Sequence, residues 1–276
     1  MSGTDGPPPD SDGPPPDADR PPPDTGGRSP GVPRPGLRAR YVQRVDASHV
    51  GGRVSIRHLA DDPDRGPVPS DVVGRLLAFD DEMALVVDRG GRLHVLDTTR
   101  IVASRVVPAH PRLAAEPDVG TEQQPLERDA ARILLLDGDQ RVLLVEHAAD
   151  RQRRVWTAPG GGLEPGEDHT IAARRELAEE LGLDLPIGPW VWSRQARFTF
   201  RGVWIEQRER WFLVRTEADY RADDAPLDDI GAVVARWWSL DELRAMTGDL
   251  APASLPDHLE ALVRHGPPPE PIDVGR

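Results

Sequence analysis

The distribution of apolar and polar residues divides the chain of 276 residues into three parts. Residues 1–36 contain almost no apolar side chains and carry the tandem heptapeptides GPPPDSD, GPPPDAD and RPPPDTG. Such a segment cannot bury enough surface to offset the conformational entropy that ordering would cost, and its proline triplets favour polyproline II. We therefore expect a disordered, Pro/Asp-rich arm at residues 1–36.

Between residues 38 and 110 the pattern changes to short apolar or alternating runs, separated by turn signals such as Asp80-Asp81 and Gly90-Gly91. A polar loop is expected over residues 61–69, and a helical turn at residues 97–100. Strands are expected at residues 53–57, 72–79, 83–87, 92–96 and 101–107. Five short strands with a helical turn before the fifth predict a small SH3-like β-barrel at residues 38–110.

The third part of the pattern predicts a second domain. Residues 111–126 are aperiodic and bear prolines, which is typical of a linker. Strands are then expected at residues 131–136, 142–146, 190–197, 203–215 and 233–238, and helices at residues 240–246 and 255–265. With one further helix before residue 183, these elements predict an α/β (α+β) fold. We expect a three-layer α/β/α sandwich with a mixed sheet at residues 127–266, followed by a C-terminal tail at residues 267–276.

The helix before residue 183 has clear start and stop signals. Asp168 can accept from the free N–H groups of a first turn, and Gly182 suits the left-handed position that ends a helix. The residues expected on the core side are Ile171, Leu177, Ala178 and Leu181. The carboxylates expected on the opposite, exposed side are Glu176, Glu179 and Glu180.

Three like charges on one face repel each other unless a cation compensates them. Magnesium accepts carboxylate oxygens and usually shares its shell with substrate phosphates. Most glutamate-rich helix faces are simply solvated, but here many more positions are specified. The whole stretch from Gly161 to Leu183, GGLEPGEDHTIAARRELAEELGL, is similar to the Nudix box, G-x5-E-x7-R-E-U-x-E-E-x-G-U with U aliphatic, at every specified position.

This resemblance, which extends over about residues 127–265, implies the Nudix fold and a hydrolase that cleaves a nucleoside diphosphate linked to another moiety. It implies that Glu176, Glu179 and Glu180 bind Mg²⁺ or Mn²⁺, together with the backbone carbonyl near Gly161. The segment before it resembles the SH3-like domain ahead of some bacterial GNAT-type acetyltransferases, through DVVGRL and IVASRVVP. No acetyltransferase pattern follows, so a structural or protein-docking module is expected there.

Catalytic roles are assigned within the box. Arg175 stands four residues before Glu179, so it can pair with that carboxylate and orient it. Glu176 shares the same site, and Glu167 is expected to anchor the loop to the helix and to lie at the substrate. Glu179 is the expected general base. The alternative bases outside the box are Asp228, Asp229 and Glu209, each of which is otherwise a solvated surface charge.

Substrate contacts are expected outside the helix. Arg153 and Arg154 precede the box and could hold distal phosphates by bidentate contacts, or could belong to an ordinary polar loop. Trp192 is a candidate for stacking on a base, with core packing as the alternative. The substrate itself stays open between a nucleoside triphosphate, a modified nucleotide and a sugar nucleotide.

The composition of the chain limits which partners and which chemistry are expected. The formal net charge of −13 argues against nucleic acid as a bulk electrostatic partner. The absence of cysteine excludes disulfides, thiolate metal sites and cysteine nucleophiles, and therefore argues against the isopentenyl-diphosphate isomerases of the same fold. No apolar run approaches membrane-spanning length, so no membrane partner and a cytoplasmic location are expected.

Two questions stay open at this level. The alternative function is a non-catalytic, nucleotide-sensing Nudix domain that is coupled to a protein-docking SH3-like module. Such domains tend to lose box carboxylates, and this chain has all of them. A protein partner of the SH3-like domain and a homodimer are both compatible with the sequence.

Overall fold

The computed structural model describes residues 45–62, 65–108, 118–148, 153–216, 220–222, 225 and 232–275. The expected Pro/Asp-rich arm at residues 1–36 and residues 111–117 of the expected linker lie outside these ranges. Within the described part of the chain, no helix has the length and apolar character needed to cross a membrane.

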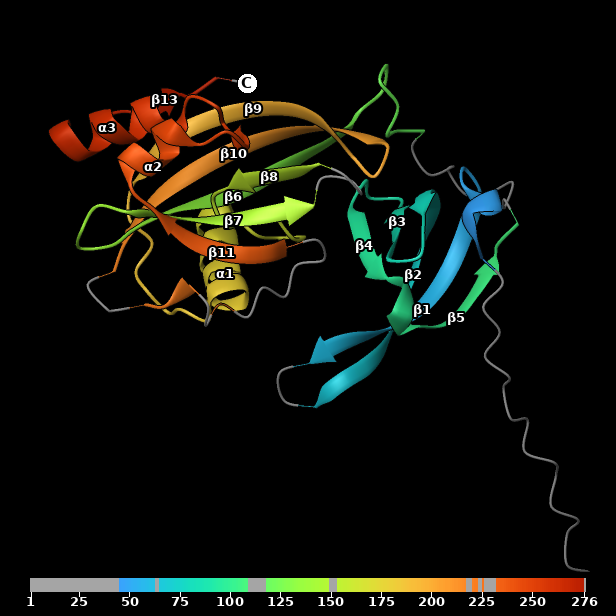
Figure 1. Cartoon of the computed structure of the whole chain (residues 1–276). Helices are drawn as coiled ribbons and strands as arrows, with labels where there is room; N and C mark the ends of the chain where they lie inside the picture. Colours follow the sequence, from blue (N-terminus) through green and yellow to red (C-terminus); the bar gives the residue numbers. More distant parts are fainter. Residues whose placement is uncertain are drawn as a thin grey trace, which may run out of the picture. The chain divides into compact units, whose positions relative to one another are not determined.

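The first part of the described chain is a five-stranded antiparallel sheet with the strand order β4-β3-β2-β1-β5 (Figure 1). Its strands are β1 Arg53–Asp62, β2 Gly66–Phe79, β3 Met83–Val87, β4 Leu93–Asp97 and β5 Ile101–Val106. The expected helical turn is present as a 3-10 turn at Thr98–Arg100, directly before β5. The assignment of this sheet as an SH3-like docking module stays a prediction.

The loop expected over residues 61–69 is wrong at both ends, because residues 61–62 belong to β1 and residues 66–69 belong to β2. Residues 66–69 pair with residues 59–62, so β1 and β2 form one long hairpin. The sequence does not reveal these paired residues, because they include polar residues and two prolines. The end of a two-stranded hairpin buries little apolar surface, so it lacks the usual alternation of apolar and polar residues.

The second part is an eight-stranded mixed sheet with the order β12-β8-β7-β6-β10-β9-β13, on which β11 also pairs with β7. Its strands are β6 Leu126–Leu136, β7 Val142–Ala148, β8 Arg154–Thr157, β9 Trp190–Phe200, β10 Val203–Arg215, β11 Ala232–Trp238, β12 Asp249–Ala251 and β13 Ile272–Asp273. The pairs β10–β6, β12–β8 and β13–β9 are parallel, and the other pairs are antiparallel. The expected mixed α+β fold is therefore present.

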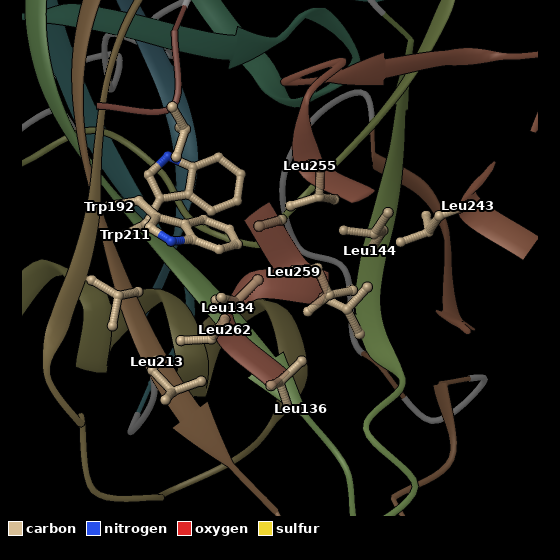
Figure 2. Packing of buried hydrophobic residues seen from close by; sticks show 14 of the residues in the cluster. Leu134, Leu136, Leu144, Trp192, Trp211, Leu213, Leu243, Leu255, Leu259 and Leu262 are labelled. Atoms are coloured by element: carbon tan, nitrogen blue, oxygen red, sulfur yellow. The ribbon is translucent and has the colours of Figure 1, made fainter. Parts of the chain in front are cut away.

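Period-two alternation along β6 sorts its side chains between two helical layers. Ile133 and Leu135 pack on one face against α1, His169–Leu181. Leu134 and Leu136 point to the other face, which is covered by α2, Leu240–Ala245, and α3, Leu255–His265. Figure 2 shows this second core, where the leucines of α3 meet the paired rings of Trp192 and Trp211. The three-layer arrangement follows from apolar residues on both faces of central strands.

The C-terminal residues belong to this domain, so the separate tail expected at residues 267–276 is wrong. Ile272 and Asp273 form β13 and pair with β9 in parallel. Val274 is buried in the same core as α3, and its carbonyl accepts a hydrogen bond from Ser254 at 2.8 Å. A proline-rich stretch gives no periodic signal, and only its docking on the edge strand β9 orders it.

Candidate active site

The ends of α1 are formed as the sequence predicts. The side chain of Asp168 accepts hydrogen bonds from the N–H groups of Thr170 and Ile171 at 2.8 and 2.9 Å. Gly182 has φ 64°, and its N–H donates to the carbonyl of Ala178. These caps satisfy backbone groups that a helix end otherwise leaves without partners, so the start and the end of the helix are set locally.

The buried side of α1 differs from the expected one. Ile171 is 53% exposed and Ala178 is also exposed, so neither holds the helix in the core. The buried residues are Ala172, Ala173, Glu176, Leu177, Glu180 and Leu181. The two small alanines allow a close approach to β6, which rotates the helix and brings two of the three carboxylates into the interior. The prediction that all three lie on the exposed side is therefore wrong, and only Glu179 is exposed.

A glycine turn receives the two buried carboxylates. The N–H of Gly160 donates to Glu180 Oε2 at 2.8 Å, and Glu180 is only 2% exposed. Gly160 has φ 129°, and a Cβ there would lie 2.2 Å from the carbonyl oxygen of Ala131. A Cβ on Gly161 would lie 2.4 Å from Glu176 Oε1. Both glycines are therefore needed, the first for its backbone and the second for the space that a carboxylate occupies.

Arg175 joins the acidic residues of the box into one network. Its Nε donates to Glu167 at 2.9 Å, and its Nη1 donates to Glu176 at 2.7 Å and to Glu179 at 2.9 Å. Its Nη2 donates to the carbonyl of Gly162 at 3.0 Å. Burial acts to lower the pKa of Arg175, but the hydrogen bond to Glu167 and the charge of Glu176 raise it above its usual value. Arg175 therefore stays charged and holds the loop, the helix and Glu179 together.

The donor set of this site suits a hard divalent cation, since every side-chain donor is a carboxylate oxygen. Glu176 and Glu180 approach the same turn from one helix, and Glu179 stands beside them in solvent. Among the residues that the structure describes, no three acidic or histidine side chains are already grouped as a metal site. The carbonyl of Gly161 accepts from the N–H of Ala131 at 3.0 Å, which uses one of its lone pairs. The residues therefore fit such an ion in chemistry, and Arg175 is the present counter-charge of Glu176 and Glu179.

The expected substrate contacts are scattered. Arg153 lines the same cleft as the box carboxylates and pairs with Asp249 at 2.7 Å, whereas Arg154 is exposed and 3.8 Å from Glu146. Trp192 is 1% exposed, so base stacking by this residue is excluded and the alternative of core packing is correct. Its neighbours in the core are Trp211 and His258. The alternative bases Asp228 and Asp229 lie outside the described residues.

Glu209, the third alternative base, is not a solvated surface charge. It is 2% exposed and lies between Arg132 and Arg194, which are in the same cleft and were missed in the sequence. Period-two alternation along β10 contained the signal, because Glu209 falls between Gln207 and Trp211 on the side that is buried. The expectation of a solvated charge at this position is therefore wrong, because the alternation places Glu209 on the buried face.

His147 lines the cleft from the end of β7. Burial, helped by the nearby charge of Arg132, lowers the pKa of His147 to about 4. The imidazole is therefore neutral near pH 7, so it adds no positive charge to the cleft. Positive charge there comes from arginines.

The glycine turn supports a first prediction. Replacing Gly161 with alanine should lower turnover about 100-fold, because the new Cβ would displace the Glu176 carboxylate by a sizeable part of an ångström. Replacing Gly162 with alanine is the matched control, since a Cβ there meets no atom closer than 3.8 Å. Steady-state assays of the two variants, with thermal melts to show that both are folded, check this. Equal activity of the two variants would show that the position of Glu176 is unimportant.

Comparison with known proteins agrees with this geometry. Residues 126–258 match the family model for the NUDIX domain. The RNA pyrophosphohydrolase of Rickettsia typhi (strain ATCC VR-144 / Wilmington) is 30% identical over 133 residues, which cover 42% of this chain and 77% of that protein. The chain therefore belongs to the Nudix family, and its second domain is a Nudix hydrolase.

Solved structures are similar to about half of the chain. A MutT protein from Methanosarcina mazei Go1 is 21% identical, with a TM-score of 0.39, and covers 52% of this chain and 97% of its own. An Ap4A hydrolase from C. elegans is 22% identical, with a TM-score of 0.39, and covers 50% of this chain and 98% of its own.

Proposed function

We propose that this protein is a divalent-metal-dependent pyrophosphohydrolase that cleaves a nucleoside diphosphate linked to another moiety. The observation that carries the proposal is the meeting of Glu176 and Glu180 at the Gly160–Gly161 turn, inside a cleft that arginines also line. Arg175 already contacts Glu176 at 2.7 Å, and a divalent cation at the turn would supply further positive charge to the two buried carboxylates. Nudix hydrolases generally use divalent metals, which supports Mg²⁺ or Mn²⁺ as that cation.

In this proposal, Glu176, Glu179 and Glu180 hold the metal together with the carbonyl near Gly161. A bound Mg²⁺ or Mn²⁺ would neutralise the charge of bridging phosphates and lower the pKa of a water. Arg175 keeps the carboxylates of Glu176 and Glu179 in place through hydrogen bonds of 2.7 and 2.9 Å.

Glu179 is proposed as the general base. It is the one carboxylate of the three that reaches solvent, so a water can approach it, and Arg175 limits its rotamers. Glu167 supports this arrangement from the loop, because it binds Arg175 and also accepts from the N–H of Glu164 at 2.8 Å. Catalysis by the chain itself then consists mainly of positioning and charge neutralisation.

The proposed substrate is a small nucleotide-type molecule. The overall charge of −13 disfavours long nucleic acid, whereas the cleft supplies local positive charge from Arg128, Arg132 and Arg194. The relative from Rickettsia typhi is named for RNA pyrophosphohydrolysis, so a short RNA with a 5′-triphosphate belongs among the candidates to be tested.

A substrate panel tests the proposal. The purified full-length chain is incubated with Mg²⁺ and with nucleoside triphosphates, modified nucleotides, sugar nucleotides, dinucleoside polyphosphates or 5′-triphosphorylated RNA, and released phosphate and pyrophosphate are measured. We expect turnover of at least one nucleotide with release of a phosphate-containing product. Tight binding of a nucleotide without any product would favour the nucleotide-sensing alternative.

A further inference from the structure

Besides the box, the cleft contains a second cluster of buried charges, which lies on the sheet. Glu209 of β10 stands directly opposite Arg194 of β9 in the antiparallel pair. Arg132 of β6, on the other neighbour of β10, also contacts Glu209. Three adjacent strands therefore bring two guanidinium groups and one carboxylate together in the cleft.

The cluster carries an excess positive charge. Burial acts to raise the pKa of Glu209, but the charges of Arg132 and Arg194 and hydrogen bonds from Trp211 and Gln207 bring it below its usual value. The carboxylate is thus ionised and balances only one of the two guanidinium groups. Backbone carbonyls stabilise Arg132, but the cluster itself still holds one more positive than negative charge, which favours an anion there.

The hydrogen bonds show which member of the cluster is fixed. Glu209 accepts from Gln207 Nε2 at 2.6 Å and from Trp211 Nε1 at 2.9 Å, which hold its carboxylate in one place. The contacts to Arg132 and Arg194 are both 3.4 Å, longer than the roughly 2.7–2.9 Å of a strong charge-assisted bond. In the described part of the chain, Nε of Arg194 is buried and has no hydrogen-bond partner. Arg194 therefore keeps donor capacity for a ligand, and Arg132 is held beside it by the carbonyls of Ala158 and Gly160, which accept from its Nη1.

One glycine connects this cluster to the box. Arg132 Nη1 donates to the carbonyl of Gly160 at 2.6 Å, and the N–H of the same Gly160 donates to Glu180. The carboxylate of Glu180 and the guanidinium group of Arg132 therefore bind the backbone of the same residue. A substrate with two linked phosphates could place one at each of the two sites.

We propose that Arg132 and Arg194 form a binding site for a phosphate group of the substrate and that Glu209 is the positioning residue that aligns them. The planar donor forks of arginine suit phosphate oxygens. This site would bind the phosphate group that does not lie at the metal held by the box carboxylates. The assignment rests on the proposed function, because it takes the anion to be part of the hydrolysed molecule.

Binding of inorganic pyrophosphate tests the site without nucleotide turnover, with Mg²⁺ present so that the box carboxylates do not repel the anion. Calorimetric titrations at low ionic strength would compare the native chain with Arg194→Gln, Arg194→Lys and Arg208→Gln. Arg208 lies on β10, is exposed and pairs with Asp129 outside the cleft, so it is the matched control. We expect Arg194→Gln to weaken binding at least about tenfold, with Arg194→Lys retaining part of it and Arg208→Gln close to native. No binding by the native chain, or equal binding by Arg194→Gln, would overturn the assignment.

Glu209→Gln supplies a second readout that a purely structural network would not give. The variant keeps the shape of the side chain but leaves two guanidinium groups without their counter-charge, so its melting temperature should fall. Pyrophosphate should then raise the melting temperature of Glu209→Gln by more than that of the native chain, because the anion replaces the lost charge. An equal or smaller rise would show that the arginines do not receive an anion. Pyrophosphate binding through Arg194 without turnover of any nucleotide would refute the proposed function and leave this site standing.

Discussion

Replacing Glu180 with glutamine should lower turnover about 1,000-fold or more, which corresponds to about 4 kcal/mol of activation free energy. The change removes one of two buried carboxylates at the glycine turn and therefore a ligand of the proposed metal. A glutamine oxygen can still accept the hydrogen bond from Gly160 that Glu180 accepts at 2.8 Å. In chelator, the free energy of unfolding should therefore stay level or rise by about 0.5 kcal/mol, because like-charge repulsion with Glu176 is relieved.

Thermal melts in EDTA and turnover assays with Mg²⁺ measure the two effects separately. Glu270→Gln is the matched control, since Glu270 is exposed and lies outside the cleft. Mg²⁺ should raise the melting temperature of the native chain by binding the folded form, and should raise that of Glu180→Gln much less. A variant that melts far lower in chelator yet hydrolyses normally would show that Glu180 is only structural.

Removal of divalent metal should abolish hydrolysis. Without a cation, Glu176 and Glu180 present negative charge at the turn and repel an anionic substrate. Activity in excess EDTA should fall below detection and return when Mg²⁺ or Mn²⁺ is added above the chelator concentration. Undiminished activity in chelator would contradict the proposed mechanism as a whole.

Zinc provides a control on the chemistry of the ligands. The site offers only oxygen donors, whereas zinc sites typically draw on histidine or cysteine. Zn²⁺ should therefore restore much less activity than Mg²⁺ at equal free concentration. If Zn²⁺ restored full activity and Glu180→Gln were still inactive, the metal site would be correct but the assignment of Mg²⁺ or Mn²⁺ would be wrong.

Local signals account for most of what could be predicted. The caps of α1 depend on Asp168 and Gly182 and on their immediate neighbours, so the helix was placed correctly. The strands expected at residues 131–136 and 203–215 are likewise present, within β6 and β10, because their apolar runs are local signals too. The box pattern indicated the class of hydrolase because it specifies residue types at many positions of one continuous stretch.

The errors occurred where a residue's surroundings come from distant parts of the chain. From its residue type, Trp192 could either stack on a base or pack in the core. Only the tertiary structure shows that it packs in the core, where residues of α3 and β10 surround it. Helical period alone predicts that Ile171 and Ala178 face the core. In the structure Ala172 and Ala173 pack against β6 instead, and this rotation of the helix leaves Ile171 and Ala178 in solvent.

The sequence by itself therefore determined the fold class, the hydrolase family and the three carboxylates of the box, because helix caps, strand alternation and the box pattern are local. The tertiary structure decided which carboxylates are buried, because the Gly160–Gly161 turn that receives Glu176 and Glu180 reaches them only through the packing of α1 on the sheet. It also brought together Arg132, Arg194 and Glu209, which lie far apart along the chain and become neighbours only when β6, β10 and β9 pair.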